Sequence, residues 1–183
     1  MIHLFLFWVI LLGEFLLGLA LLISHFFPSH RIWPPPGKKT WQYYYIWILT
    51  YISLIILIIL GFLDWNSFTF DFLVWRILGI SIFGIGIFIL AWGMWTLSLQ
   101  LTRGLKGELI TNGPYKYSRN PQYVGINLAI LGYIFFTNSF LSLITGTIGM
   151  VLFVITPFVE EPWLKELFGS KYEVYCQKVR RFF

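Results

Sequence analysis

Charged side chains are scarce in this sequence: they make up 11% of its 183 residues, whereas 58% are hydrophobic. A soluble domain of this size carries about a quarter charged residues. The scarcity excludes an ordinary soluble protein and predicts an all-α integral membrane protein surrounded by membrane lipids. The net charge of +5 does not indicate a nucleic-acid partner, because the basic residues gather between apolar runs, as in membrane proteins.

Reactive and metal-ligating side chains are equally few. The single cysteine, Cys176, excludes an internal disulfide. The histidines His3, His25 and His30 are scattered, and no Cys/His cluster has the spacing of a metal site, so no metal is predicted. No Ser/His/Asp or Cys/His arrangement for nucleophilic catalysis is evident. Catalysis without such groups would rest on positioning the reactants and excluding water.

Long apolar runs are abundant, and five of them are long enough for transmembrane helices. They cover roughly residues 2–27, 44–63, 72–99, 121–138 and 139–157. The first run lacks the basic region and cleavage site of a signal peptide, so we expect it to be retained. The last two runs should form a helical hairpin, followed by an amphipathic tail in which Pro162 begins a helix and Gly169 ends it.

The basic residues predict an orientation. All of them except Arg76 lie in the proline-rich connector 28–39, in the loop before Pro121, or in the C-terminal tail. The turns at 64–71 and around Asn138 carry none. The positive-inside rule then places the N-terminus outside and the C-terminal tail in the cytoplasm. The connector is either an anchor at headgroup level or a lip over a lipid-facing entrance.

Two features inside the runs have open interpretations. Glu14 lies in the middle of the first run, where a carboxylate must face the bundle interior or be protonated; it either contacts a ligand or hydrogen-bonds a neighbouring helix. Gly79, Gly86 and Gly93 recur every seven residues and predict a face for close helix packing.

Two polar motifs interrupt the second half of the chain. The first reads Gly113-Pro-Tyr-Lys-Tyr-Ser-Arg-Asn-Pro-Gln-Tyr-Val-Gly125, and the second runs from Glu160-Glu161 through Leu164, Phe168, Gly169, Tyr172, Tyr175 and Val179. Pro121 suits the first position of a helix, whose free N–H groups favour anionic ligand groups. The predicted hairpin brings Pro121 and Glu160 to the same membrane surface.

Together the motifs resemble the isoprenylcysteine carboxyl methyltransferase family and its phospholipid methyltransferase relatives. The resemblance covers roughly residues 79–183, with Asn120 where the family usually has His. It implies one membrane-embedded domain over residues 1–183 that uses S-adenosylmethionine and releases S-adenosylhomocysteine, with the cofactor site built mainly from residues 100–183. By this resemblance Arg119 is catalytic, and the cofactor is bound by Gln100, Leu109, Ile110, Tyr115, Asn120, Pro121, Tyr123, Glu160 and Glu161.

The chemistry of the cofactor agrees with that set. A carboxylate of Glu160 or Glu161 suits its amino group, and Arg119 with the helix start suits its carboxylate. Salt bridges from the glutamates to Arg119 or Lys116 are the structural alternative. In the phospholipid relatives, glycines on the third helix are linked to the cofactor, which draws attention to Gly84 and Gly86 here.

The resemblance predicts a lipid-like acceptor, with carboxyl O-methylation of an isoprenylcysteine-type substrate placed first. The alternative is N-methylation of a phospholipid amine; a sterol-reductase-like or non-catalytic membrane protein ranks lower. The prenyl-carboxylate enzymes carry an Arg four residues before the glutamate pair, where this sequence has Thr156. An amine acceptor must lose a proton, which Glu160, Glu161 or Glu14 can accept.

Overall fold

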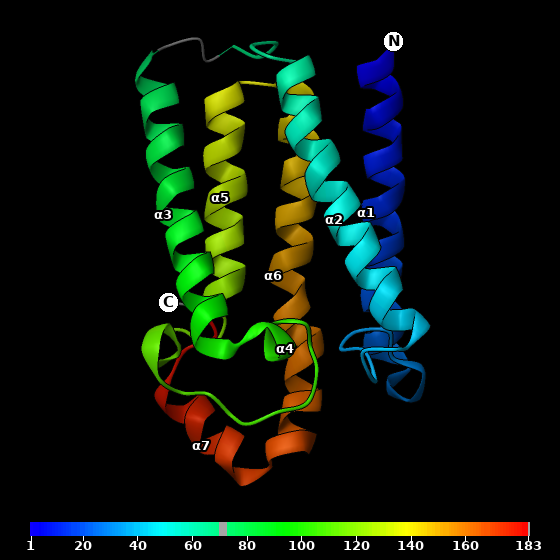
Figure 1. Ribbon diagram of the computed structural model, residues 1–183, viewed down its shortest axis with the longest axis vertical. Coiled ribbons are helices and arrows are strands. Elements are labelled where there is room, and N and C mark those ends of the chain that lie inside the picture. Colours follow the sequence, from blue (N-terminus) through cyan, green and yellow to red (C-terminus); the bar gives the residue numbers. More distant parts are fainter. Residues whose placement is uncertain (70–72, 183) are drawn as a thin grey trace.

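The computed structural model describes residues 1–69 and 73–182, and within them every regular element is a helix, as predicted. The long helices lie side by side along the molecule (Figure 1): α1 (Ile2–Phe26), α2 (Trp41–Leu63), α3 (Leu73–Leu97), α5 (Pro121–Thr137) and α6 (Phe140–Phe168). The short ones gather at one end: η1 (Pro28–His30), α4 (Leu99–Thr102), η2 (Gly113–Lys116) and α7 (Ser170–Lys178).

The membrane crossings are supported in part. Among the described residues, α1, α2, α3 and α6 are long and apolar enough to span a membrane. α5 has 17 residues and is shorter than these four. The fifth crossing therefore stays a prediction. The predicted start of the third run, Phe72, and the end of the preceding turn, Asp71, lie outside the described residues.

α6 differs from its prediction. It runs without a break for 29 residues, through Pro157 and Pro162, rather than ending near Pro157 and restarting at Pro162. Proline's fixed φ fits a helix, and membrane helices tolerate its missing N–H where neighbouring helices and Ser/Thr side chains support the backbone. In the turn before Pro157, the Thr156 hydroxyl donates to the Leu152 carbonyl at 2.7 Å. The helix ends at Gly169, as predicted, so one continuous rod carries both glutamates.

The glycine face of α3 packs directly against α5. A Cβ added at Gly79 would lie 2.6 Å from the main-chain nitrogen of Phe136, and one at Gly125 would lie 2.5 Å from that of Leu90. Side chains larger than hydrogen therefore do not fit between these backbones. The predicted close packing of this face is confirmed, and it fixes the start of α5 against α3.

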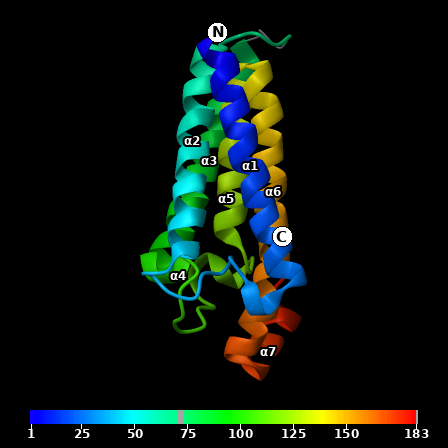
Figure 2. The ribbon, with the colours of Figure 1, turned by 90° about the vertical axis from the view of Figure 1, so that its right-hand side faces the viewer.

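The two ends of the bundle differ in chemistry. At the end near the N-terminus, Asp64 accepts hydrogen bonds from Ser67 (2.7 Å), Ser139 (2.7 Å) and the Leu141 main chain (3.0 Å). Burial acts to raise the pKa of Asp64, but these hydrogen bonds outweigh it and hold the pKa below its ordinary value. The connector, the loop before α5 and the tail all lie at the opposite end, as Figures 1 and 2 show. We call this the basic end.

Candidate functional site

The C-terminal tail is hydrogen-bonded to the segment that precedes α5. The main-chain nitrogen of Arg119 donates to the Arg180 carbonyl at 2.9 Å. Asn120 Nδ2 and Ser118 Oγ both donate to the Arg181 carbonyl, at 3.0 and 3.2 Å. The amide of Asn120 thus links the two motifs, which lie far apart in the sequence but form one unit at the basic end.

Glu161 is engaged by arginines. Arg181 forms a bidentate pair with it, at 2.9 Å through Nε and 2.7 Å through Nη2, and Arg119 Nη2 lies 3.2 Å from its Oε1. The hydrogen bonds that Arg181 donates to Glu161 are the main reason that the pKa of Arg181 is raised. Arg119 also contacts Cys176 Sγ. Glu161 therefore forms the salt bridge to Arg119 that the sequence analysis gave as the alternative to cofactor binding. It lines neither of the two cavities described below.

Glu160 has a different environment from its neighbour. Its Oε2 accepts a hydrogen bond from the Tyr123 hydroxyl at 2.9 Å. The indole N–H of Trp33, from the connector, is directed at these two groups. That N–H is buried and makes no hydrogen bond of normal geometry within the described part of the chain. The Glu160 carboxylate, the Tyr123 hydroxyl and the Trp33 indole therefore form one buried polar cluster.

A cavity of about 100 Å³ at the basic end collects most of the predicted site residues. It is lined by Leu109, Ile110, Tyr115, Arg119, Asn120, Tyr123 and Glu160. Trp163, Tyr172 and Tyr175 line it as well, although the sequence analysis assigned them no role in the site. Tyr175 donates its hydroxyl proton to the Tyr115 carbonyl at 2.7 Å. Burial raises the pKa of the Tyr115 hydroxyl, which therefore stays neutral at physiological pH. We call this the polar cavity.

Besides Glu161, two further predicted cofactor residues lie outside the polar cavity. Gln100 is exposed, and its Nε2 donates to the Lys106 carbonyl at 3.3 Å. Pro121 is buried, and its Cγ would lie 3.6 Å from a Cβ added at Gly93. The structure thus gives Pro121 a packing role, and cofactor contacts for both residues stay predictions.

The two glycines of α3 that the resemblance singled out are also away from the cavities. A Cβ at Gly84 would meet nothing within 4 Å. A Cβ at Gly86 would lie 2.7 Å from the Gly125 carbonyl oxygen, so Gly86 packs against α5.

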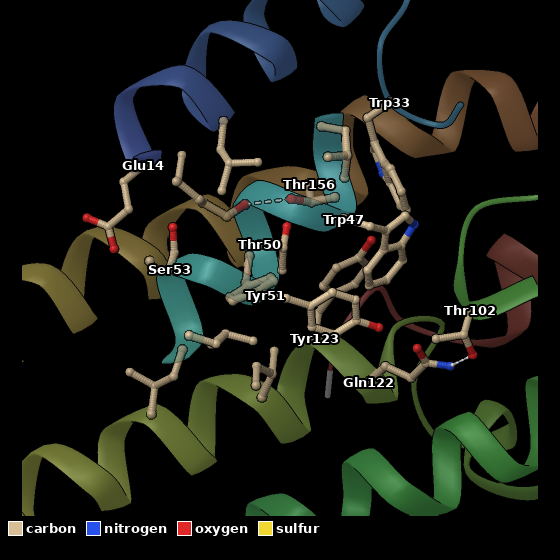
Figure 3. Close-up of a pocket in the computed structure, with 18 of the residues that line it drawn as sticks. Glu14, Trp33, Trp47, Thr50, Tyr51, Ser53, Thr102, Gln122, Tyr123 and Thr156 are labelled. Atoms are coloured by element: carbon tan, nitrogen blue, oxygen red, sulfur yellow. Dashed lines mark hydrogen bonds between the residues drawn. The ribbon is translucent and has the colours of Figure 1, made fainter. Parts of the chain in front are cut away.

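A second cavity, of about 240 Å³, lies among α1, α2, α5 and α6 (Figure 3). Its walls are mostly apolar, with Leu17, Leu54 and Phe153 among them. Glu14 and Ser53 line it on the side away from Gln122. Glu14 is only 4% exposed, and its Oε2 has no hydrogen-bond partner among the described residues. The carboxylate therefore faces the bundle interior, as predicted. Its Oε2 does not form the predicted alternative, a hydrogen bond to a neighbouring helix, within the described residues. We call this the apolar cavity.

The two cavities share a wall formed by Thr102, Gln122 and Tyr123. Gln122 Nε2 donates to Thr102 Oγ1 at 3.0 Å and to the Tyr115 hydroxyl at 2.9 Å, which fixes its amide at the junction (Figure 3). Sequence reasoning missed Gln122 because the resemblance assigns no role to this position. Its one available signal is its place on the first turn of α5, beside Tyr123.

The structure therefore places a cavity with charged and polar groups in its wall next to a mostly apolar cavity, inside a bundle of apolar helices. The chain belongs to the phospholipid methyltransferase family, which matches residues 74–171. It is 31% identical over 106 residues to phosphatidylethanolamine N-methyltransferase B of Dictyostelium discoideum. The alignment covers 52% of this chain and 52% of that protein, so the chain spans about half the length of this curated relative. None of the solved structures matches significantly.

Proposed function

We propose that this protein transfers a methyl group from S-adenosylmethionine to the amino group of a membrane phospholipid. The observation that carries the proposal is the wall shared by the two cavities. The polar cavity suits a water-soluble donor and the apolar cavity suits a lipid acceptor, so the two ligands would meet at Gln122 and Tyr123. Membership of the phospholipid methyltransferase family supports this assignment.

The proposed methyl acceptor differs from the one ranked first on the sequence. There the carboxylate of an isoprenylcysteine came first and a phospholipid amine second. The family and the relative, which is named as an N-methyltransferase, favour the amine. Thr156 lines the apolar cavity at the position where the prenyl-carboxylate enzymes carry an Arg. Its side chain is uncharged, and its hydroxyl donates to the Leu152 carbonyl, so it offers no cation to hold a substrate carboxylate.

The residues of the polar cavity fit the cofactor. S-adenosylmethionine supplies an electrophilic methyl group on a sulfonium. Glu160 would hold the cofactor's amino group through Oε1, since Oε2 is bonded to Tyr123. Arg119 would hold its carboxylate, because Nε of Arg119 is buried without a hydrogen-bond partner in the described chain. The rings of Tyr115 and Trp163 offer aromatic walls for the adenine and the sulfonium.

The same groups can handle the proton of the amine. Glu161 is held by two arginines, and Glu14 lies away from the shared wall. Glu108 also lines the polar cavity, but Glu160 is the carboxylate hydrogen-bonded to Tyr123 of the shared wall. Tyr123 lies on that wall and donates to Glu160, so its hydroxyl would relay the proton of the acceptor to this carboxylate. Gln122 would orient the acceptor nitrogen.

The test is incubation of the purified protein in lipid nanodiscs with S-adenosylmethionine that carries a labelled methyl group. Phosphatidylethanolamine and a prenylcysteine are offered in parallel, and the labelled product is identified by mass spectrometry. We expect label on the nitrogen of the phospholipid. Label on the prenylcysteine carboxylate alone would restore the first prediction, and label on neither acceptor would refute the proposal.

We further propose that the basic end faces the cytoplasm, because the turn on the opposite side carries no Lys or Arg from Asp64 to Asp71. Thr69 and Lys38 are both exposed. In a Cys176→Ala background, Thr69→Cys should react with a membrane-impermeant thiol reagent in intact cells, whereas Lys38→Cys should react only after lysis. The reverse pattern would invert the orientation.

A further inference from the structure

Arg103 introduces a positive charge into the wall of the apolar cavity. Of the described residues that line this cavity, it alone is cationic. In the described part of the chain, no carboxylate lies within salt-bridge distance of its guanidinium, and its hydrogen bond goes to the neutral hydroxyl of Tyr43 at 3.1 Å. A cation against apolar walls is unfavourable unless an anion compensates it.

The position of Arg103 is fixed by the loop that carries it. Gly104 has a φ of +73°, and a Cβ there would lie 2.9 Å from the Trp33 ring and 3.1 Å from Pro35. The loop therefore packs tightly on the connector, with Trp33 also lining the apolar cavity. Arg103 directly follows Thr102, a member of the shared wall, and its side chain lines the apolar cavity while donating to Tyr43 of α2.

We propose that Arg103 binds the phosphate of the acceptor lipid, an inference that rests on the proposed phospholipid substrate. The planar guanidinium matches the geometry of phosphate oxygens and can donate two parallel hydrogen bonds. In an ethanolamine lipid only a short linker separates the nitrogen from the phosphate. A phosphate held at Arg103 therefore leaves the nitrogen beside Gln122 and Tyr123, while the acyl portion occupies the apolar remainder of the cavity.

The experiment compares two lipids with identical chains. Dioleoylphosphatidylethanolamine or dioleoylglycerol is added to the purified protein in detergent, and the affinity for each lipid is obtained from the increase in melting temperature with lipid concentration. The parent protein should bind the phospholipid more tightly than the diacylglycerol. Arg103→Gln should weaken phospholipid binding by about tenfold or more and leave diacylglycerol binding unchanged, because only the phosphate contact is lost. Arg103→Lys, which keeps the charge, should recover part of the difference.

Two matched variants separate this role from a structural one. Lys106→Gln removes an exposed cation from the same loop and should keep the preference for the phospholipid. Tyr43→Phe removes the hydrogen-bond partner of Arg103 and should also keep it. If Arg103→Gln weakens both lipids equally, or if Lys106→Gln has the same effect, the phosphate site is overturned.

The methylation assay distinguishes failure of this inference from failure of the proposed function. For an active parent, Arg103→Gln should raise the KM for phosphatidylethanolamine by a similar factor and leave the KM for S-adenosylmethionine unchanged. A parent that binds the phospholipid through Arg103 without methylating it would refute the proposed function alone. A parent that methylates it equally well with and without Arg103 would refute the phosphate site alone.

Discussion

The α3–α5 pair and the group formed by α1, α2 and α6 are both built from apolar helices, but they pack differently. Between α3 and α5, glycines bring the two backbones into contact. Around α1, α2 and α6, large side chains such as Leu17, Leu54 and Phe153 lie beside small residues, and a cavity of about 240 Å³ remains where this group meets α3 and α5. Hydrophobicity alone does not decide packing inside a membrane; the size of the residues at the contact does.

The two regions therefore have different roles in the proposed reaction. Gln122 and Tyr123 stand on the first turn of α5, which is locked against α3, so their positions are fixed. Under the proposed function, the cavity beside the other three helices would take a lipid chain. A rigid site beside an accommodating cavity suits an enzyme that must place one atom accurately while accepting a flexible substrate.

The largest effect is expected from filling the α3–α5 contact. In Gly86→Leu the new side chain would meet the main chain of α5, which cannot move aside without separating the helices. We expect the free energy of unfolding to fall by more than about 3 kcal/mol, beyond the usual range for overpacking. Thermal melting in detergent measures it.

Gly84→Leu is the control, because a Cβ at Gly84 meets nothing within 4 Å. This variant adds the same side chain to the same helix and should melt close to the parent. Equal melting of the two leucine variants would remove the distinction between the packed and the open face of α3.

The second effect concerns the polar cavity. Glu160→Gln should weaken S-adenosylhomocysteine binding by about 1.5–3 kcal/mol, because a charge-assisted hydrogen bond becomes a neutral one. Glu166→Gln, at an exposed position farther along α6, should leave the affinity unchanged. Calorimetric titration of the two variants gives the comparison directly. Equal affinities would refute the assignment of Glu160 to the cofactor site.

The smallest effects come from two polar residues of α1. Ser24 Oγ accepts hydrogen bonds from the main-chain nitrogens of Ile32 and Trp33, both at 2.9 Å. Ser24→Ala leaves these donors without their partner and should lower the free energy of unfolding by about 1–3 kcal/mol, measured by thermal melting.

Glu14→Leu removes a carboxyl group with an unpartnered oxygen from an apolar cavity, and its melting temperature should be equal to or above that of the parent. A large loss in Glu14→Leu would indicate a structural partner for this carboxylate.

The sequence carries some of these features openly. The seven-residue spacing of Gly79, Gly86 and Gly93 identifies a packing face because helical periodicity alone determines it. Tyr115, Tyr123 and Glu160 could be predicted because a motif places each of them. Their gathering around one cavity agrees with the hairpin geometry inferred from two adjacent apolar runs.

Other features depend on contacts that no local pattern encodes. Neighbours on a helix point about 100° apart, so the sequence does not tell which of Glu160 and Glu161 faces the cavity and which meets the arginines. The continuation of α6 through Pro162 depends on support from surrounding segments, which outweighs the local preference of proline for a helix start. Arg103 and Gln122 acquire their positions only when the loop after α4, the connector and α5 pack together.

The wall shared by the two cavities has a consequence for the energy of catalysis. Transferring a lipid chain of about 16 carbons from the bilayer into water costs roughly 13 kcal/mol, at about 0.8 kcal/mol per methylene. Because the apolar cavity lies within the helical span and ends at Gln122, an acceptor bound there keeps its chains in an oily environment throughout the reaction. In the proposed reaction the water-soluble reactant would travel to the lipid, and no lipid extraction step would have to precede chemistry.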